Sequence, residues 1–347
     1  MQKVIKVHEK PLIMMKKIKL SFANLTVEFT DRNLALRRIE EWAEKSTFPV
    51  QVIYGPEGCG KTAWLKQSIE LLKELGFNVI YINPLNKEVI TEFGITNLRD
   101  RFLTLVRDAI AQNALDRLTW LAFDMAKELI KETKSKVAVI TDDAFQIIGI
   151  RNAAIYVKAL LNLIEYPPEM YERIITIATT SEGVSLREIG RHEWADLRPM
   201  WNMPKEGFRQ LYEQIPGDKL DLLETWRLTG GNPRMLENLY KVNWDIDVVI
   251  EDIIRRKNIT PQFIARWRNW LEEAIKDPDT LWSPNAPEEL INELIEKNLI
   301  LYFLPERKPW FWIDQPPLEK DPELGIGRYV AWQTPLHREA IRKALGK

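Results

Sequence analysis

One short segment constrains the fold of this chain more than any other. Residues 55–62, Gly-Pro-Glu-Gly-Cys-Gly-Lys-Thr, fit the phosphate-binding loop (P-loop) pattern G-x-x-x-x-G-K-[ST] without a mismatch. An apolar run over residues 50–54 precedes them and a helical pattern follows from residue 63. Glycines let successive backbone N–H groups point at a phosphate, and the N-terminal end of the next helix adds a positive field. The segment therefore predicts a nucleotide-binding α/β domain rather than an ordinary strand-to-helix turn.

The residues of this loop have separate expected roles. Lys61 is expected to reach the β- and γ-phosphates, and Thr62 is expected to hold Mg²⁺. We interpret Cys59 as a small residue that the loop tolerates. The nucleotide-binding set predicted here comprises Gly55, Pro56, Glu57, Gly58, Cys59, Gly60, Lys61, Thr62 and Ala63.

Polar residues also end two later apolar runs. Asp142 and Asp143 follow "KVAVIT", and a carboxylate at the C-terminal end of a buried parallel strand lies in the crevice where α/β sheets bind ligands. We expect Asp142 to hold Mg²⁺ through its water shell and Asp143 to polarise the attacking water, although paired aspartates also open turns. Thr179, Thr180 and Ser181 end the next run, where one of them could sense the γ-phosphate or cap the following helix.

Charge and cysteine content exclude several classes of protein. The chain of 347 residues has 49 Lys and Arg against 50 Asp and Glu, so its overall charge gives no indication of nucleic acid binding. A single cysteine excludes an internal disulfide, and with only three histidines it leaves little for a zinc site. The apolar runs are too short for a membrane span, and "PLIMM" is too short for a signal-peptide core. We therefore expect a cytoplasmic protein without a membrane partner.

Patterns along the chain divide it into four predicted regions. Residues 1–25 carry six lysines against one glutamate with little periodicity, which predicts a basic N-terminal arm, flexible or forming an edge strand. Over residues 26–203 apolar strands alternate with helical patterns, which is typical of a parallel sheet with helices on both faces. Residues 204–260 show helical patterns only and are predicted to form a helical lid. Residues 261–347 read as helix, strand, strand and closing helix, which suggests a winged-helix domain.

The order of these motifs resembles the archaeal ATPase family, within the AAA+/STAND group of P-loop proteins. The resemblance covers about residues 26–260. It rests on the segments "FTDRNLALRRIEEW", "GPEGCGKT", "VITDDAFQ", "IATTSEG", "IGRHEWADLRPM" and "LTGGNPRMLENL". It implies ATP as the nucleotide, a sheet ordered 5-1-4-3-2, and a helical lid followed by a winged helix.

The resemblance also implies roles for residues outside the P-loop. Asp31 and Arg32 would lie in the entry segment that flanks the adenine, and Ser181 would take the place of the polar sensor. Arg191 would face a γ-phosphate, either in its own subunit or in a neighbouring one, or else form a surface ion pair. The lid motif that closes over the nucleotide would contain Gly231, Pro233 and Arg234, and a surface ion pair is the alternative for this arginine too.

One residue departs from the family pattern. The family usually follows the first carboxylate with Glu, whereas this chain has Asp143, which is one methylene shorter. Its oxygen would fall roughly 1–1.5 Å short of the expected water position, and a misplacement of that size can cost about 100-fold in rate. Slow hydrolysis is therefore expected, which suits a timed switch better than a motor.

Three functions remain open at this stage. The preferred one is a Mg²⁺-dependent ATPase that switches or remodels a protein or nucleic acid partner and could act as a homo-oligomer. The second is a DNA-directed ATPase akin to origin-recognition initiators, but residues 261–347 hold 12 Lys and Arg against 14 Asp and Glu, which is unfavourable for duplex binding. The third is a small-molecule kinase, which we disfavour because we find no compact Arg-rich lid between strands.

Overall fold

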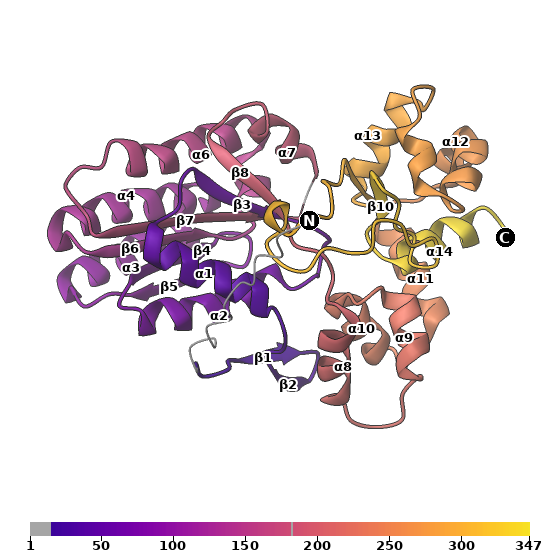
Figure 1. Cartoon of the computed structure of the whole chain (residues 1–347), viewed down its shortest axis with the longest axis horizontal. Coiled ribbons are helices and arrows are strands. Elements are labelled where there is room, and N and C mark those ends of the chain that lie inside the picture. The colour runs from indigo at the N-terminus through magenta and orange to yellow at the C-terminus, as the bar shows by residue number, and fades with distance from the viewer. Residues whose placement is uncertain (1–14, 182) are drawn as a thin grey trace, which may run out of the picture.

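The chain forms an α/β core on one side and a mostly helical C-terminal half on the other (Figure 1). The structure is a computed structural model that describes residues 15–181 and 183–347. Residues 1–14 of the predicted basic arm lie outside the described residues. The described part of the arm enters a hairpin of β1 (Lys19–Phe22) and β2 (Leu25–Glu28), which crosses the boundary predicted at residue 25.

The central sheet runs in the order β5-β4-β6-β7-β3-β8. Its strands are β3 (Val50–Tyr54), β4 (Asn78–Asn83), β5 (Glu88–Glu92), β6 (Lys136–Thr141), β7 (Arg173–Thr180) and β8 (Ala195–Pro199). The parallel strands alone, numbered along the chain, read 5-1-4-3-2 from the β8 edge. A wholly parallel sheet was expected, but the sheet is mixed because β5 pairs antiparallel with β4. A turn of four residues joins these two strands, whereas a parallel neighbour needs a crossover of a dozen or more.

Helices cover both faces of this sheet (Figure 1). In β6, alternate side chains pack against the helices on opposite faces of the sheet. Val137 and Val139 pack with α3 (Thr96–Ala111), α4 (Leu115–Thr133) and α6 (Ile150–Glu165), while Ala138 and Ile140 pack with α1 (Asn33–Lys45) and α2 (Lys61–Glu74). Because both faces are buried, these strands read as continuous apolar runs. The shorter helices of the core are α5 (Phe145–Ile148) and α7 (Gly183–Ile189).

The C-terminal half is mostly helical and has one large apolar core beside two smaller apolar clusters. Its elements are α8 (Lys205–Glu213), α9 (Leu222–Thr229), α10 (Pro233–Lys241), α11 (Ile246–Arg256), α12 (Pro261–Ala274), η1 (Pro278–Trp282), α13 (Glu288–Glu296), β9 (Ile300–Tyr302), η2 (Pro309–Phe311), β10 (Val330–Trp332) and α14 (Pro335–Ala344). The core joins Met235 and Ile250 of the predicted lid to Leu294 and Trp332, so it runs across the boundary predicted at residue 260. β9 and β10 pair antiparallel, and the winged-helix assignment stays a prediction.

The β1–β2 hairpin and the segment around η2 both contact the other half of the chain. The β1–β2 hairpin packs Phe22 and Val27 against Phe208 of α8. The segment around η2 returns to the sheet, where the N–H of Ile313 donates to the carbonyl of Pro199 at the end of β8, 3.2 Å away. Across the described residues, none of the helices has the length and apolar character needed to cross a membrane.

Candidate nucleotide-binding site

The P-loop joins β3 to α2 at the edge of the sheet where the parallel strands end. Gly55 has φ 152°, and a Cβ there would lie 2.0 Å from the carbonyl oxygen of Met200, so the approach of β8 to the loop requires glycine. Gly58 has φ 76°, and a Cβ there would lie 2.1 Å from Cβ of Arg234 at the start of α10. These two glycines therefore let the core and the predicted lid both contact the loop closely.

Lys61 folds back onto its own loop. Only 4% of the residue is exposed, and its Nζ donates to the carbonyls of Gly55 and Pro56 at 3.0 and 3.1 Å. Backbone carbonyls satisfy the ammonium without neutralising it. An anionic phosphate is a stronger partner for this charge, since hydrogen bonds between ionised groups are about twice as strong as neutral ones.

Asp142 lies at the end of β6 with its carboxylate wholly buried. Its Oδ2 accepts from Thr62 Oγ1 at 2.8 Å, from the hydroxyl of Tyr81 at 3.0 Å and from Nδ2 of Asn83 at 3.0 Å, while Thr179 donates to Oδ1. The structure thus brings together the two residues predicted to hold Mg²⁺. Tyr81 and Asn83 were not among the predicted site residues, although two polar side chains late in the buried run "NVIYIN" were a usable signal.

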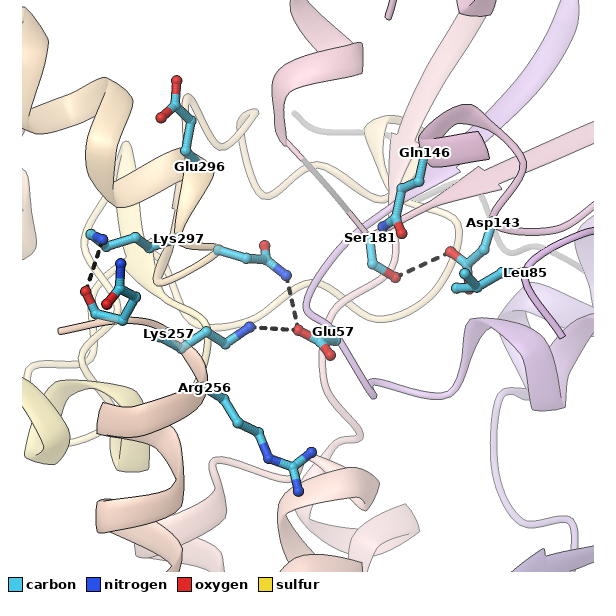
Figure 2. A pocket seen from close by; sticks show the side chains of 11 residues that line it. Glu57, Leu85, Asp143, Gln146, Ser181, Arg256, Lys257, Glu296 and Lys297 are labelled. Atoms are coloured by element: carbon cyan, nitrogen blue, oxygen red, sulfur yellow. Dashed lines mark hydrogen bonds and ion pairs between the residues drawn. The ribbon is translucent and has the colours of Figure 1, made fainter. Parts of the chain in front are cut away.

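Asp143 lies beside this carboxylate with a positive φ of 48°. Burial, reinforced by the charge of Asp142, raises the pKa of Asp143 to about 6, while Lys61 and Ser181 act in the opposite direction. The hydroxyl of Ser181 faces Oδ1 of Asp143 at 3.4 Å (Figure 2). Of the polar residues that end β7, Thr179 therefore orients Asp142, and Ser181 contacts the other carboxylate.

Arg191 and Arg234, which were predicted to act at the nucleotide, pair with surface glutamates instead. Arg191 follows α7, 70% of its side chain is exposed, and it pairs with Glu188 of the same helix at 3.1 Å. Arg234 is 56% exposed and pairs with Glu237 of α10 at 3.1 Å. In this structure both make the surface ion pairs that were the alternative interpretation. The backbone of Arg234 does meet the P-loop, because its N–H lies 3.3 Å from the carbonyl of Gly58.

Comparison with known families agrees with this geometry. The family model described as an ATPase domain predominantly from Archaea matches residues 29–239, more than half of the chain. The chain belongs to this ATPase family. The matched range of the ATPase domain contains the P-loop, both carboxylates and the start of α10. A search of the curated proteins found no match to this chain.

Solved structures are similar to the ATPase only at a coarse level. DnaA from Aquifex aeolicus bound to AMPPCP has a TM-score of 0.36 and 16% identity, over 76% of this chain and 75% of that one. The Aeropyrum pernix ORC1 protein in complex with DNA has a TM-score of 0.39 and 14% identity, over 92% of both chains. At such TM-scores the likeness carries no argument about function.

The buried side chain of Arg32 contacts the backbone of the P-loop. The residue is 2% exposed, and its guanidinium donates to the carbonyls of Cys59 and Trp201 and to Oδ2 of Asp314, the last at 2.8 Å. Asp314 comes from the segment that follows η2, so no local sequence pattern indicates this pair. Burial raises the pKa of the neighbouring Asp31, whose carboxylate lies against α8.

Glu57 connects the tip of the P-loop to the C-terminal half of the ATPase. Its carboxylate accepts from Lys257 Nζ at 2.7 Å and from Asn298 Nδ2 at 3.1 Å, and its N–H donates to the side chain of Gln333 at 2.9 Å. The side chain of Asn232, just before α10, donates to the carbonyl of Glu57 at 2.9 Å. Residues from four separate connecting segments therefore converge on one residue of the loop.

Proposed function

We propose that the chain binds Mg·ATP in the P-loop and hydrolyses it slowly, to switch the conformation of its C-terminal half for a protein or nucleic acid partner. The observation that carries this proposal is the convergence of Lys61, Thr62, Asp142 and Asp143 at one edge of the sheet, within a matched ATPase domain. Phosphoryl transfer to water needs charge stabilisation and a positioned nucleophile. This group of residues offers both.

The oxygen donors present suit Mg²⁺, which prefers oxygen ligands and keeps several of its waters. Thr62 and Asp142 would hold it, since their oxygens already lie 2.8 Å apart and Tyr81 and Asn83 orient the carboxylate. When bound, the metal would offset the negative charge of the phosphates.

Asp143 would orient the attacking water and accept its proton. Burial raises the pKa of the Asp143 carboxyl, which makes it a better proton acceptor than an exposed aspartate. Ser181 would hold the Asp143 carboxylate in place and act as the polar sensor near the γ-phosphate. Lys61 would leave the carbonyls of its loop for the phosphates.

The remaining predicted residues complete the proposal. Gly231, Pro233 and Arg234 would close over the nucleotide at the start of α10. The segment that contains Asp31 and Arg32 would flank the adenine, and Arg191 would act toward the γ-phosphate. The division into an ATPase core at 26–203, a helical lid at 204–260 and a winged helix at 261–347 is proposed on the same footing. Contact between the start of α10 and Gly58 supports the lid.

Titration of the protein with Mg·ATP, alongside measurement of phosphate release, tests this function. Lys61→Ala should abolish tight binding, because a charge-assisted contact inside the loop is lost. Lys66→Ala is the matched control, since Lys66 lies on the same helix and pairs with Glu88 of β5 at 2.8 Å. Undiminished ATP affinity in a folded Lys61→Ala variant would overturn the assignment. Added DNA that stimulates turnover would identify the partner as nucleic acid.

A further inference from the structure

A cavity of about 530 Å³ separates the carboxylates of the core from the C-terminal half. Glu57, Asp143 and Ser181 of the core line it, together with Lys257 and Asn298 of the C-terminal half. Figure 2 shows Lys257 on the opposite side of this space from Asp143. The residue proposed to orient the attacking water therefore faces the same space as a lysine of the C-terminal half. None of the roles described above uses this lysine.

Glu57 makes this space electrostatically unusual. It is a carboxylate within a loop whose task is to bind a polyanion. Although burial acts to raise it, the pKa of Glu57 is lowered by the ammonium of Lys257 and by the amide of Asn298, so the group is ionised at neutral pH. A triphosphate arriving beside Glu57 and Asp143 would be repelled by both side chains. Besides Lys61 and the Mg²⁺ proposed at Thr62 and Asp142, a cation on the Glu57 side of the cavity would favour binding of the terminal phosphate.

We propose that Lys257 binds the terminal phosphate of ATP, exchanging its contact with Glu57 for one with the nucleotide. This inference rests on the proposed ATP site and names a specificity-determining residue for it. A phosphate carries more charge than a carboxylate and offers three terminal oxygens, so it competes well for a lysine already within the cavity. ADP lacks the terminal phosphate and leaves Lys257 on Glu57.

Other cations near the cavity fit this role less well. Lys297 also lines the cavity, but its Nζ donates to the carbonyl of Asn258 at 2.9 Å. Arg256 also lines the cavity, but 72% of its side chain is exposed and its Nε pairs with Asp252 of its own helix at 2.6 Å. The side chain of Arg234 is 56% exposed and paired within α10. Only 18% of the Lys257 side chain is exposed, so water screens its charge less than the charge of either arginine.

The test compares affinities for ADP and for a non-hydrolysable ATP analogue, both with Mg²⁺, by calorimetry on the full chain. Lys257→Met should weaken binding of the ATP analogue by about 10- to 100-fold, the range for a lost hydrogen bond to a charged group. ADP affinity should change by less than about threefold. Lys257→Arg should retain most of the preference for ATP. Arg256→Met is the matched control and should leave both affinities unchanged.

Testing Lys257→Met in a Glu57→Gln variant distinguishes phosphate binding by Lys257 from simple neutralisation of Glu57. Glu57→Gln removes the repulsion and frees Lys257, so it should raise affinity for the ATP analogue. If Lys257 binds the phosphate, adding Lys257→Met to Glu57→Gln should still lower that affinity about tenfold. If Lys257 serves only to neutralise Glu57, the second substitution will have no effect, and the inference is wrong.

Other outcomes are equally decisive. Equal losses of ADP and ATP-analogue affinity in Lys257→Met would reduce the residue to a structural contact and overturn the inference. The proposed function would survive that result, because it depends on binding by the parent protein and its loss in Lys61→Ala. A parent protein that binds neither nucleotide would refute the proposed function itself.

Discussion

Replacing Asp314 with alanine measures how firmly the C-terminal half holds the P-loop. The carboxylate lies 2.8 Å from the guanidinium of Arg32, and the two side chains are 4% and 2% exposed. The other contacts of Arg32 are the carbonyls of Cys59 and Trp201, which accept hydrogen bonds but carry no net charge. Asp314→Ala would therefore remove the only carboxylate that is hydrogen-bonded to the buried guanidinium among the described residues, and would leave Asp31 as a nearby anion that makes no hydrogen bond to it.

The expected loss is large compared with the stability of a protein. Removing one partner of a buried ion pair costs about 3–5 kcal/mol, whereas an exposed pair contributes about 0–1 kcal/mol. Total free energies of unfolding are only about 5–15 kcal/mol. The exposed pair between Lys276 and Glu273, with side chains 66% and 57% exposed, supplies the comparison through Glu273→Ala.

Urea unfolding followed by circular dichroism measures the difference in stability, and calorimetry measures ATP affinity for the same variants. Asp314→Ala should lower the midpoint strongly and also weaken ATP binding, because Arg32 contacts the P-loop through Cys59. Replacing the pair together, as Arg32→Met with Asp314→Leu, should recover part of the stability because no uncompensated charge remains. A loss below about 1 kcal/mol in Asp314→Ala, similar to that of Glu273→Ala, would refute the reasoning.

Three further predictions concern turnover and partners. Asp143→Asn should keep ATP binding and stop phosphate release, and Asp143→Glu should raise the rate if side-chain reach is limiting; parent-like rates in both variants would assign the water to another residue. Arg191 is exposed enough to serve a neighbouring copy, so turnover per chain should rise with protein concentration, Arg191→Ala should lose that rise, and mixing it with Asp143→Asn should restore part of it. DNA binding by the chain, measured by fluorescence anisotropy, should be weak and fade between about 50 and 200 mM salt, and sequence-specific binding that survives such salt would contradict the charge balance of residues 261–347.

Periodicity in the sequence was sufficient to predict most of the core. The parallel strands have apolar runs because both of their faces are buried, and the helices between them show amphipathic patterns. β5 was missed because "EVITE" is short, only partly buried and flanked by charged residues, so nothing separates it from a loop. The hairpin across residue 25 was hidden for a similar reason. Its stability depends on packing against α8, which local sequence does not report.

Motif spacing located the chemical centre but not its supports. The P-loop and the aspartate pair are local patterns, and the structure brings Thr62 and Asp142 together. Partners distant in sequence could not be read in this way. Asp314 lies 282 residues from Arg32, and Lys257 lies 200 residues from Glu57. Each contact follows from how the C-terminal half returns to the core, which no short pattern encodes.

The supports of the P-loop suggest how nucleotide state could reach a partner. Arg32 contacts the P-loop and pairs with Asp314, and Glu57 at the tip of the loop pairs with Lys257. Both ion pairs therefore connect the loop to the C-terminal half. A ligand shifts a conformational equilibrium only by its difference in affinity for the two states. If the Lys257 contact gives ATP a tenfold preference for one arrangement of this half, the shift is about 1.4 kcal/mol. That magnitude is too small for a power stroke but sufficient to bias partner binding, and slow hydrolysis by Asp143 would set how long the bias lasts.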